Sequence, residues 1–247
     1  MAFCCARSRE CLCLTQRNLQ VVSSMPAVPG ISAMLFSPCE RYLFQLSSEA
    51  DCIHTRCTAT GELLYAAPAG VFPRSLRMDG EGKALLVSGG AENEARLLTM
   101  PDLRTERVIS TRHACAAADF WRGGLVLVCA AEGEDIRTKV YTLAHGKLKP
   151  RNIVELPGAP GALCVCPDEE HALLSTRDGF FKVELATGKL CWNQPQWAMS
   201  LKIEATGGMA LVSDTLDGSV WLFHHERPWE KRRLACSESA QASFVST

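Results

Sequence analysis

The sequence predicts an all-β protein: a six-bladed β-propeller of four-stranded antiparallel blades, closed by a C-terminal strand that joins three N-terminal strands. Three observations predict this fold. A turn-and-strand pattern recurs about every 40 residues, which is a period typical of propeller blades. The apolar runs between the turns are short and rich in Val, Leu, Ile and Phe, as strands are. Finally, an apolar run at the C-terminus supplies the strand that the N-terminal group lacks.

The first recurring element is a polar turn that enters an apolar run. It occurs at 36–43, 78–85, 121–125, 166–173 and 205–211. A second turn follows downstream at 59–63, 144–148 and 186–190, where a glycine allows the positive φ that a tight hairpin requires. The Asp-Gly pairs at 178–179 and 217–218 lie between apolar runs and favour two-residue hairpins.

Each repeat is predicted to contain four strands and no helix. In the fifth repeat the strands are expected at 161–166, 171–176, 180–185 and 190–193, where the run FFKVEL alternates apolar and polar residues. First strands are expected to begin near Ile31, Pro73, Ala114, Gly161, Met199 and Gln241. Blades of this kind bury both faces against their neighbours.

The two ends of the chain predict how the ring closes. Three strands are expected before the first full repeat, at 2–6, 11–15 and 19–24, and the missing first strand is expected at 242–246, which contains Phe244. A blade shared by both termini leaves no open sheet edge. The alternative is a truncated seven-bladed ring whose apolar tail is fortuitous.

Composition limits the class of protein. The 247 residues are expected to form a single domain, 1–247, since one all-β domain of this length is ordinary. With 26 Lys and Arg against 27 Asp and Glu, the net charge of −1 argues against nucleic-acid and membrane-surface partners. The 13 cysteines, an odd number, and the absence of a secretory signal at 1–15 predict reduced thiols and a cytoplasmic protein.

Several motifs resemble a known family. The run SPCERYLFQLSSEADCIH at 37–54, followed by ATGEL at 59–63, is similar to the YVTN-type propeller repeat of YncE-like proteins. The run GVFP at 70–73 resembles that family's turn before the innermost strand, and LVSD at 211–214 stands where its name motif falls. The resemblance implies a propeller that binds diverse partners or ligands and shares no catalytic residues with its relatives. The Gly-His and Trp-Asp signatures of WD40 repeats are absent.

The metal-binding residue types do not form a recognised motif. The pairs Cys11-x-Cys13 and Cys164-x-Cys166 each place two sulfurs on one face of a strand, and Cys4 is a candidate cross-strand neighbour of Cys13. Because no C-x-x-C, H-x-H or HExxH motif occurs, buried apolar packing is favoured over zinc or redox chemistry. The His224-His225 pair is expected to be exposed at a turn. No metal and no cofactor are predicted.

Loops are the expected binding elements, because a rigid scaffold presents its variable loops. An aromatic side chain beside convergent polar and cationic groups suits a small-molecule pocket. Such groups are expected at the channel mouth, at Arg74, His113, Gln196, Trp197, Lys202 and Gln241. The other loops of the same face carry carboxylates, which indicate a cation-binding surface or ordinary solvated turns: Glu49, Asp51, Glu92, Glu94, Glu132, Glu134, Asp135, Asp178, Asp214 and Asp217.

These observations predict a binding or scaffold propeller that is not an enzyme. Its partner is expected to be a protein or a small molecule, and its oligomeric state is left open. The alternative is a hydrolase or lactonase-like enzyme with a metal in the channel, for which only Asp119 and Glu204 on the first strands qualify as ligands. A structural subunit of a larger assembly is a third possibility.

Overall fold

The computed structural model describes residues 2–5, 10–14, 21–89, 92–122, 124–131, 136–145, 147, 149–195, 202–206, 208–213 and 219–236. The chain divides into two compact units, Met1–Ala118 and Asp119–Thr247, with the division inside strand β12. Every element of the described residues is a β-strand, and none of them forms a helix that could cross a bilayer. The prediction of a single domain is not tested by this division.

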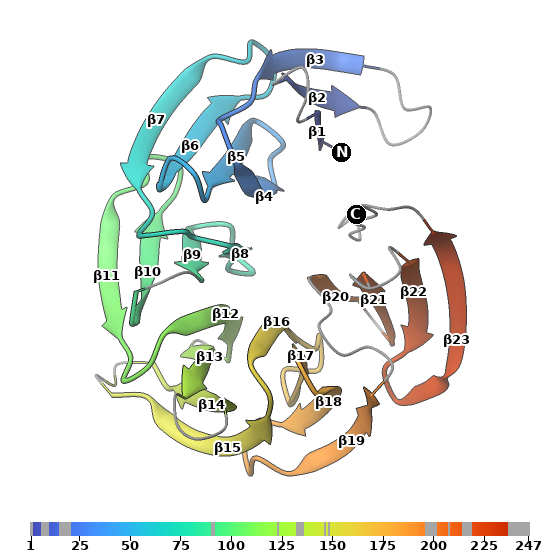
Figure 1. Cartoon of the computed structure of the whole chain (residues 1–247). Coiled ribbons are helices and arrows are strands. Elements are labelled where there is room, and N and C mark those ends of the chain that lie inside the picture. The colour runs from blue at the N-terminus through green and yellow to red at the C-terminus, as the bar shows by residue number, and fades with distance from the viewer. Residues whose placement is uncertain are drawn as a thin grey trace. The chain divides into compact units, whose positions relative to one another are not determined.

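The first unit contains three complete sheets, each formed by strands that follow one another in the chain (Figure 1). The first has three strands: β1 (Ala2–Cys5), β2 (Glu10–Leu14) and β3 (Val21–Pro26). The second has four: β4 (Ile31–Phe36), β5 (Tyr42–Ser47), β6 (Cys52–Cys57) and β7 (Leu63–Pro68). The third has β8 (Ser75–Met78), β9 (Ala84–Ser88), β10 (Glu94–Thr99) and β11 (Thr105–Ser110).

The remaining three sheets have the same antiparallel order. One consists of β12 (Cys115–Trp121), β13 (Gly124–Ala131), β14 (Arg137–Leu143) and β15 (Arg151–Pro157). The next consists of β16 (Pro160–Val165), β17 (His171–Thr176), β18 (Gly179–Glu184) and β19 (Leu190–Gln194). The last consists of β20 (Lys202–Thr206), β21 (Met209–Ser213), β22 (Ser219–His224) and β23 (Arg227–Cys236). The predicted four-stranded antiparallel unit is therefore confirmed.

The recurring polar turn has one backbone geometry in both units. In the first unit Ser37 N–H donates to the Tyr42 carbonyl at 2.9 Å, and Glu40 has a φ of 56°. In the second unit Cys166 N–H donates to the His171 carbonyl at 2.8 Å, and Glu169 has a φ of 53°. We call these the Ser37 turn (residues 37–42) and the Cys166 turn (residues 166–171).

Each unit has an apolar core between neighbouring sheets. In the first unit the buried cluster combines Phe44, Leu46 and Ile53 with residues of β8–β10 such as Leu85 and Leu98. In the second unit Phe180 stacks on Trp192 with ring centroids 5.8 Å apart and meets Phe223 edge-on at 5.9 Å. Paired aromatic rings of this kind add to the stabilisation that burial provides. The sheets β16–β19 and β20–β23 are thus fixed against each other.

Several predicted strand starts differ from the observed ones by one to three residues. The strand expected at Pro73 begins at Ser75, because proline has no N–H to donate to the ladder and the first bond to β9 comes from the Arg74 N–H to the Ser88 carbonyl. The first strand expected near Met199 is β20, which begins at Lys202. The strand expected at 242–246, with Phe244, lies outside the described residues, so neither the closure nor the blade count is tested.

Candidate functional site

The structure describes the side chains of only two of the six predicted channel-mouth residues. The Arg74 N–H donates to the Ser88 carbonyl at 3.0 Å. The N–H of Gly89, the residue after Ser88, donates to the Cys115 carbonyl at 2.8 Å. The segments that carry Arg74 and His113 therefore both lie beside Ser88 and Gly89. Among the described atoms, His113 Nε2 is buried and has no hydrogen-bond partner.

The other four channel-mouth residues are not placed. Gln196, Trp197 and Gln241 lie outside the described residues, and Lys202 begins β20 without a described side chain. The six-residue pocket remains a prediction from the sequence.

Three of the five described loop carboxylates, Asp51, Glu92 and Glu94, are engaged in local contacts. Arg96 Nε donates to Glu94 at 2.7 Å and Arg96 Nη2 to Glu92 at 3.2 Å, while Asp51 accepts the Phe72 N–H at 2.8 Å. These contacts fit solvated turns better than a shared cation surface. Of the same predicted set, Glu132, Glu134, Asp135, Asp214 and Asp217 lie outside the described residues.

Asp119, a ligand in the enzyme alternative, bonds to the backbone. Its Oδ2 accepts the Val165 N–H at 2.9 Å, and its Oδ1 accepts the N–H of Phe120 at 2.9 Å. The carboxylate thereby links β12 to β16, a role in positioning strands. The side chain of Glu204 lies outside the described residues, and whether the protein is an enzyme remains untested.

The cysteine positions require one correction. The register of β1 and β2 pairs Cys4 with Cys11 and places Cys13 opposite Ala2, so the expected pairing of Cys4 with Cys13 is wrong. The observed register is two residues away from the expected pairing. Cys164 and Cys166 are both buried, and burial strongly raises the pKa of the Cys166 thiol, with the nearby Cys164 and Asp168 adding to the effect. A protonated, buried thiol acts as an apolar packing group.

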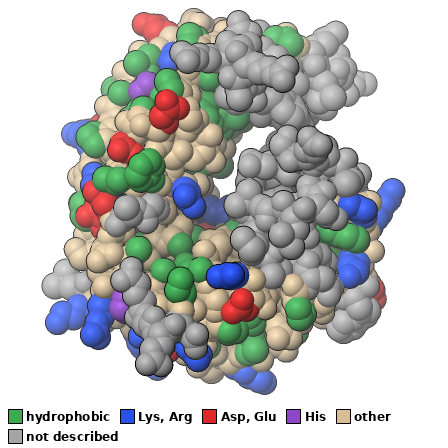
Figure 2. Space-filling view, in the orientation of Figure 1, with side chains coloured by type: hydrophobic (Ala, Val, Ile, Leu, Met, Phe, Trp, Pro, Cys, Tyr) green, Lys and Arg blue, Asp and Glu red, His purple; other side chains and the backbone are tan. Residues whose placement is uncertain are grey.

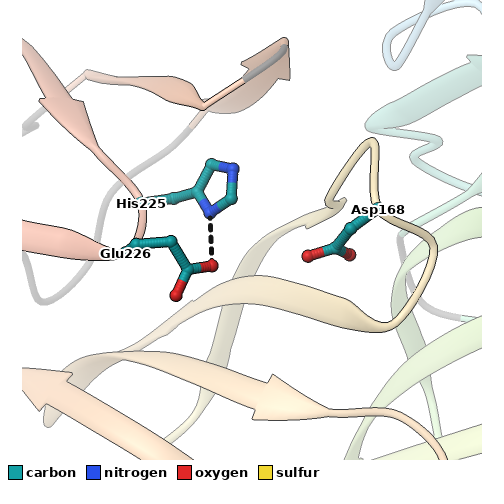
Figure 3. A group of neighbouring side chains, drawn as sticks. All are labelled: Asp168, His225 and Glu226. Carbon is teal, nitrogen blue, oxygen red and sulfur yellow. Dashed lines mark ion pairs between the residues drawn. The ribbon is translucent and has the colours of Figure 1, made fainter.

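A cluster of possible metal ligands forms in the second unit, where two loops of neighbouring sheets meet. Asp168 belongs to the Cys166 turn, and His225 and Glu226 form the hairpin between β22 and β23. One ligand atom from each residue lies within 4.8 Å of the other two. Figure 3 shows the Asp168 carboxylate pointing toward His225 and Glu226. We call these three residues the Asp168 cluster.

The members of the Asp168 cluster differ in burial. The His225 ring is 6% exposed, with Nδ1 3.2 Å from Glu226 Oε1, whereas the Glu226 side chain is 55% exposed. Buried Lys182 of β18 donates to the same Glu226 oxygen. This hydrogen bond lowers the pKa of Glu226 against the opposing effect of burial, so the carboxylate is charged at neutral pH.

Asp168 is held by hydrogen bonds from its own turn. Its Oδ1 accepts the N–H groups of Glu170 at 2.8 Å and His171 at 3.0 Å, and its Oδ2 lies 2.9 Å from His171 Nδ1. Burial alone raises the pKa of Asp168, but these hydrogen bonds outweigh it and hold the pKa below its usual range. The cluster therefore presents two carboxylates and one buried imidazole.

Sequence reasoning missed this cluster. The expectation that the His224-His225 turn is exposed is wrong for His225, because the turn packs on the neighbouring sheet, where Trp192 Nε1 donates to the His225 carbonyl at 3.2 Å. Asp168 was visible only as part of a repeated turn. The repeat pattern does show that the Cys166 turn and the His225–Glu226 hairpin are polar turns of consecutive repeats. It does not show that they lie close together, because their proximity depends on how the two sheets pack.

A shallow cavity lies beside the Ser37 turn in the first unit. It has a volume of about 190 Å³ and is lined by Ser37, Pro38, Cys39, Tyr42, Glu81, Gly82, Met100 and Pro101. The Cys39 sulfur lies 3.3 Å from Ser37 Oγ. That hydrogen bond, together with one from the Arg41 backbone, lowers the pKa of the Cys39 thiol.

The outer strands of the sheets differ in their side chains. Strand β7 carries no charged residue, and Leu63, Leu64 and Tyr65 are 44%, 37% and 42% exposed. Strand β23 is basic: Lys231 and Arg233 lie over the Trp221 ring, 5.4 and 5.7 Å from its centroid. Figure 2 shows Lys and Arg side chains at the outer edge of the second unit, on the side where Figure 1 labels β23.

Comparison with known proteins supports the fold. No protein-family model and no curated protein matches the sequence. Many solved structures do match, three of them at 12–16% sequence identity. The dihydro-heme d1 dehydrogenase NirN in complex with DHE has a TM-score of 0.71 at 16% identity over 94% of this chain and 53% of its own. Kuenenia stuttgartiensis hydrazine synthase has a TM-score of 0.78 at 12% identity over 95% of this chain and 82% of its own.

The third structure is the β-propeller domain of Cps50 (Swd1) from Myceliophteria thermophila, with a TM-score of 0.63 at 14% identity over 80% of this chain and 66% of its own. This chain thus spans about half the length of the NirN chain. Because the three proteins differ in function, the likeness shows the β-propeller fold and no activity.

Proposed function

We propose that this chain is a non-catalytic binding or scaffold module that docks an extended segment of a partner protein on its outer strand β7. The observation that carries the proposal is the exposed, uncharged edge of that strand. β7 is the last strand of its sheet, so among the described residues no strand pairs with its outer edge. Leu63, Leu64 and Tyr65 are all more than a third exposed.

An exposed sheet edge can accept an added strand through backbone hydrogen bonds. Folded proteins usually prevent this pairing with charged side chains on the edge. The outer strands β11, β15 and β23 carry such exposed charges, including Glu106, Glu155 and Lys231. β7 lacks them, as do the outer strands β3 and β19. Among the described residues of these three strands, only β7 has three large apolar side chains that are more than a third exposed. Pro68, which has no N–H, limits the available edge to residues 63–67.

The side chains near β7 favour an uncharged segment as the occupant. A β-bulge at Leu64 breaks the alternation of side chains in β7, since Tyr65 pairs with Thr55 and Leu63 pairs with the next residue of β6, Arg56. Tyr65 and Leu63 therefore point to opposite faces of the sheet. Phe72, in the loop that follows β7, is 55% exposed and adds apolar surface. A bound strand would bury these side chains on both faces, and its own charges would be desolvated without partners.

Finer features of the fold belong to the same proposal. The three-stranded sheet β1–β3 lacks a first strand, as expected if residues 242–246 complete a sixth blade. The shared geometry of the Ser37 and Cys166 turns supports membership of the YVTN-type repeats. A cytoplasmic location is supported by the 13 cysteines.

The test is selection of linear peptides from a display library against the full-length protein. Selected peptides are expected to be uncharged and extended, and to slow amide hydrogen exchange in residues 63–67. Leu64→Lys should weaken their binding by about tenfold or more, because it adds a charge to the pairing edge. The matched control is Val108→Lys on the outer strand β11, where Val108 is 45% exposed, and it should leave binding unchanged.

Two results would overturn the proposal. One is selection of peptides that protect other strands and bind the Leu64→Lys variant equally well. The other is a concentration-dependent dimer in sedimentation with slowed exchange at residues 63–67, which would make a second copy of the chain the occupant of β7.

A further inference from the structure

The Asp168 cluster, in the second unit, contains the donor types of a divalent-cation site and shares no residue with the β7 edge. Two carboxylates and one imidazole are donors that first-row divalent ions accept. The three donors come from two chain segments that lie more than 50 residues apart in sequence, so their proximity is a product of the fold. The two carboxylates are exposed to solvent, which gives an ion a path of entry.

The donors are held by a surrounding set of hydrogen bonds. His171 Nδ1 and two backbone N–H groups orient the Asp168 carboxylate. The Trp192 indole N–H fixes the backbone of His225, and Trp192 itself stacks on Phe180 in the core. Outer groups that orient ligands in this way are typical of metal sites.

The distances require a small closure. A four-coordinate ion with bonds of about 2.1 Å holds its ligand atoms about 3.4 Å apart. The three ligand atoms lie within 4.8 Å of one another, so the exposed carboxylates must rotate inward while the buried His225 ring stays in place.

Charge decides how tightly an ion can bind. Asp168 and Glu226 contribute two negative charges and Lys182 one positive charge, so with neutral imidazoles the site has a formal charge of −1. In the absence of a metal, the Lys182 ammonium neutralises Glu226. An incoming cation must compete with that ammonium, which limits its affinity.

We propose that Asp168, His225 and Glu226 bind one first-row divalent cation, with solvent completing the coordination and Lys182 acting as the competing cation. Mn²⁺ is the suitable probe, because carboxylates favour it and the thiols of the 13 cysteines favour softer ions such as Zn²⁺.

The experiment is an electron paramagnetic resonance titration of free Mn²⁺ with the chelator-treated full-length protein. One bound Mn²⁺ per chain is expected. Asp168→Asn and Glu226→Gln, which preserve side-chain volume at exposed positions, should each weaken binding by about tenfold. Lys182→Met should strengthen it, a gain that loss of folding cannot produce.

The matched control is Glu230→Gln in the same hairpin segment, whose carboxylate pairs with Arg227 at 2.8 Å. It should leave the affinity unchanged. The proposal is overturned if the protein binds no Mn²⁺ at millimolar concentration. It is equally overturned if binding persists within twofold in both carboxamide variants, or if Glu230→Gln weakens it as much as they do. None of these outcomes bears on peptide docking at β7, so the two proposals fail independently.

Discussion

The Ser37 and Cys166 turns have the same backbone and different chemistry. Both are closed by a hydrogen bond from the first residue to the carbonyl of the sixth, and both place a glutamate at positive φ. In the Ser37 turn a serine hydroxyl accepts the Tyr42 N–H at 3.1 Å and an exposed thiol lies beside a cavity. In the Cys166 turn the thiol is buried and the carboxylate of Asp168 accepts two backbone N–H groups.

The difference shows which part of a repeat can vary in its chemistry. The backbone hydrogen bonds recur because the hairpin between the first two strands requires them, whatever side chains are present. The side chains can differ at any position where more than one residue type can accept the backbone N–H groups of the turn. What each turn can bind then depends on the neighbouring sheet: the segment around Met100 and Pro101 lines the cavity of the first, and the His225–Glu226 hairpin faces the second.

The largest expected difference between the two turns is in thiol reactivity. Cys39 is exposed with a lowered pKa, whereas Cys166 is buried with a raised one, so iodoacetamide should modify Cys39 at least about 100-fold faster in the native protein. The rate at Cys39 should rise at a lower pH than for an ordinary thiol, since its thiolate forms earlier. Mass spectrometry of timed digests measures both rates, with protein unfolded in urea as the control in which Cys166 reacts. Equal native rates would contradict the assigned environments.

Residues 79–84 form a third copy of the turn, in which the Asp79 N–H donates to the Ala84 carbonyl at 3.1 Å and Gly82 takes the place of Glu40. This copy tests how closely neighbouring turns pack. Gly82 has a φ of 67°, and a Cβ added there would lie 2.6 Å from Pro38 Cγ of the Ser37 turn. Gly82→Ala should therefore lower the free energy of unfolding by about 2 kcal/mol, measured by urea denaturation. The control, Gly80→Ala, meets no atom within 4 Å and should change it by about 0.5 kcal/mol or less. Similar losses in both variants would mean that the turn does not contact Pro38 in solution.

The smallest expected effect concerns the polar side chains that cap the two turns. Asp168→Ala removes a charged acceptor of two backbone N–H groups and should cost about 1.5 kcal/mol of unfolding free energy. Ser37→Ala removes a neutral acceptor of one and should cost about 0.7 kcal/mol. Urea denaturation of both variants without added metal gives the comparison. A larger loss in Ser37→Ala would reverse the ranking of the two caps.

Part of the structure was accessible to sequence reasoning because it depends on local contacts. The polar turns at 36–43 and 166–173, the short apolar runs and the glycines of the second turns predict four-stranded antiparallel sheets, and the structure has them. Strand starts were displaced by up to three residues, as at Pro73, because proline has no N–H to donate and the first bond to the neighbouring strand comes from Arg74. The apolar pattern alone does not locate the first hydrogen bond of a strand.

The sequence by itself determined the repeat and the strand order within each four-stranded sheet, since both follow from residues close together in the chain. The tertiary structure decided that His225 is buried, that Asp168 faces it, and that β7 presents an uncharged edge. These features depend on which side chains of neighbouring sheets interdigitate, as Trp192 of β19 does with Phe223 of β22. Close packing between residues distant in the chain leaves no periodic trace in either segment, and so it could be read only from the folded molecule.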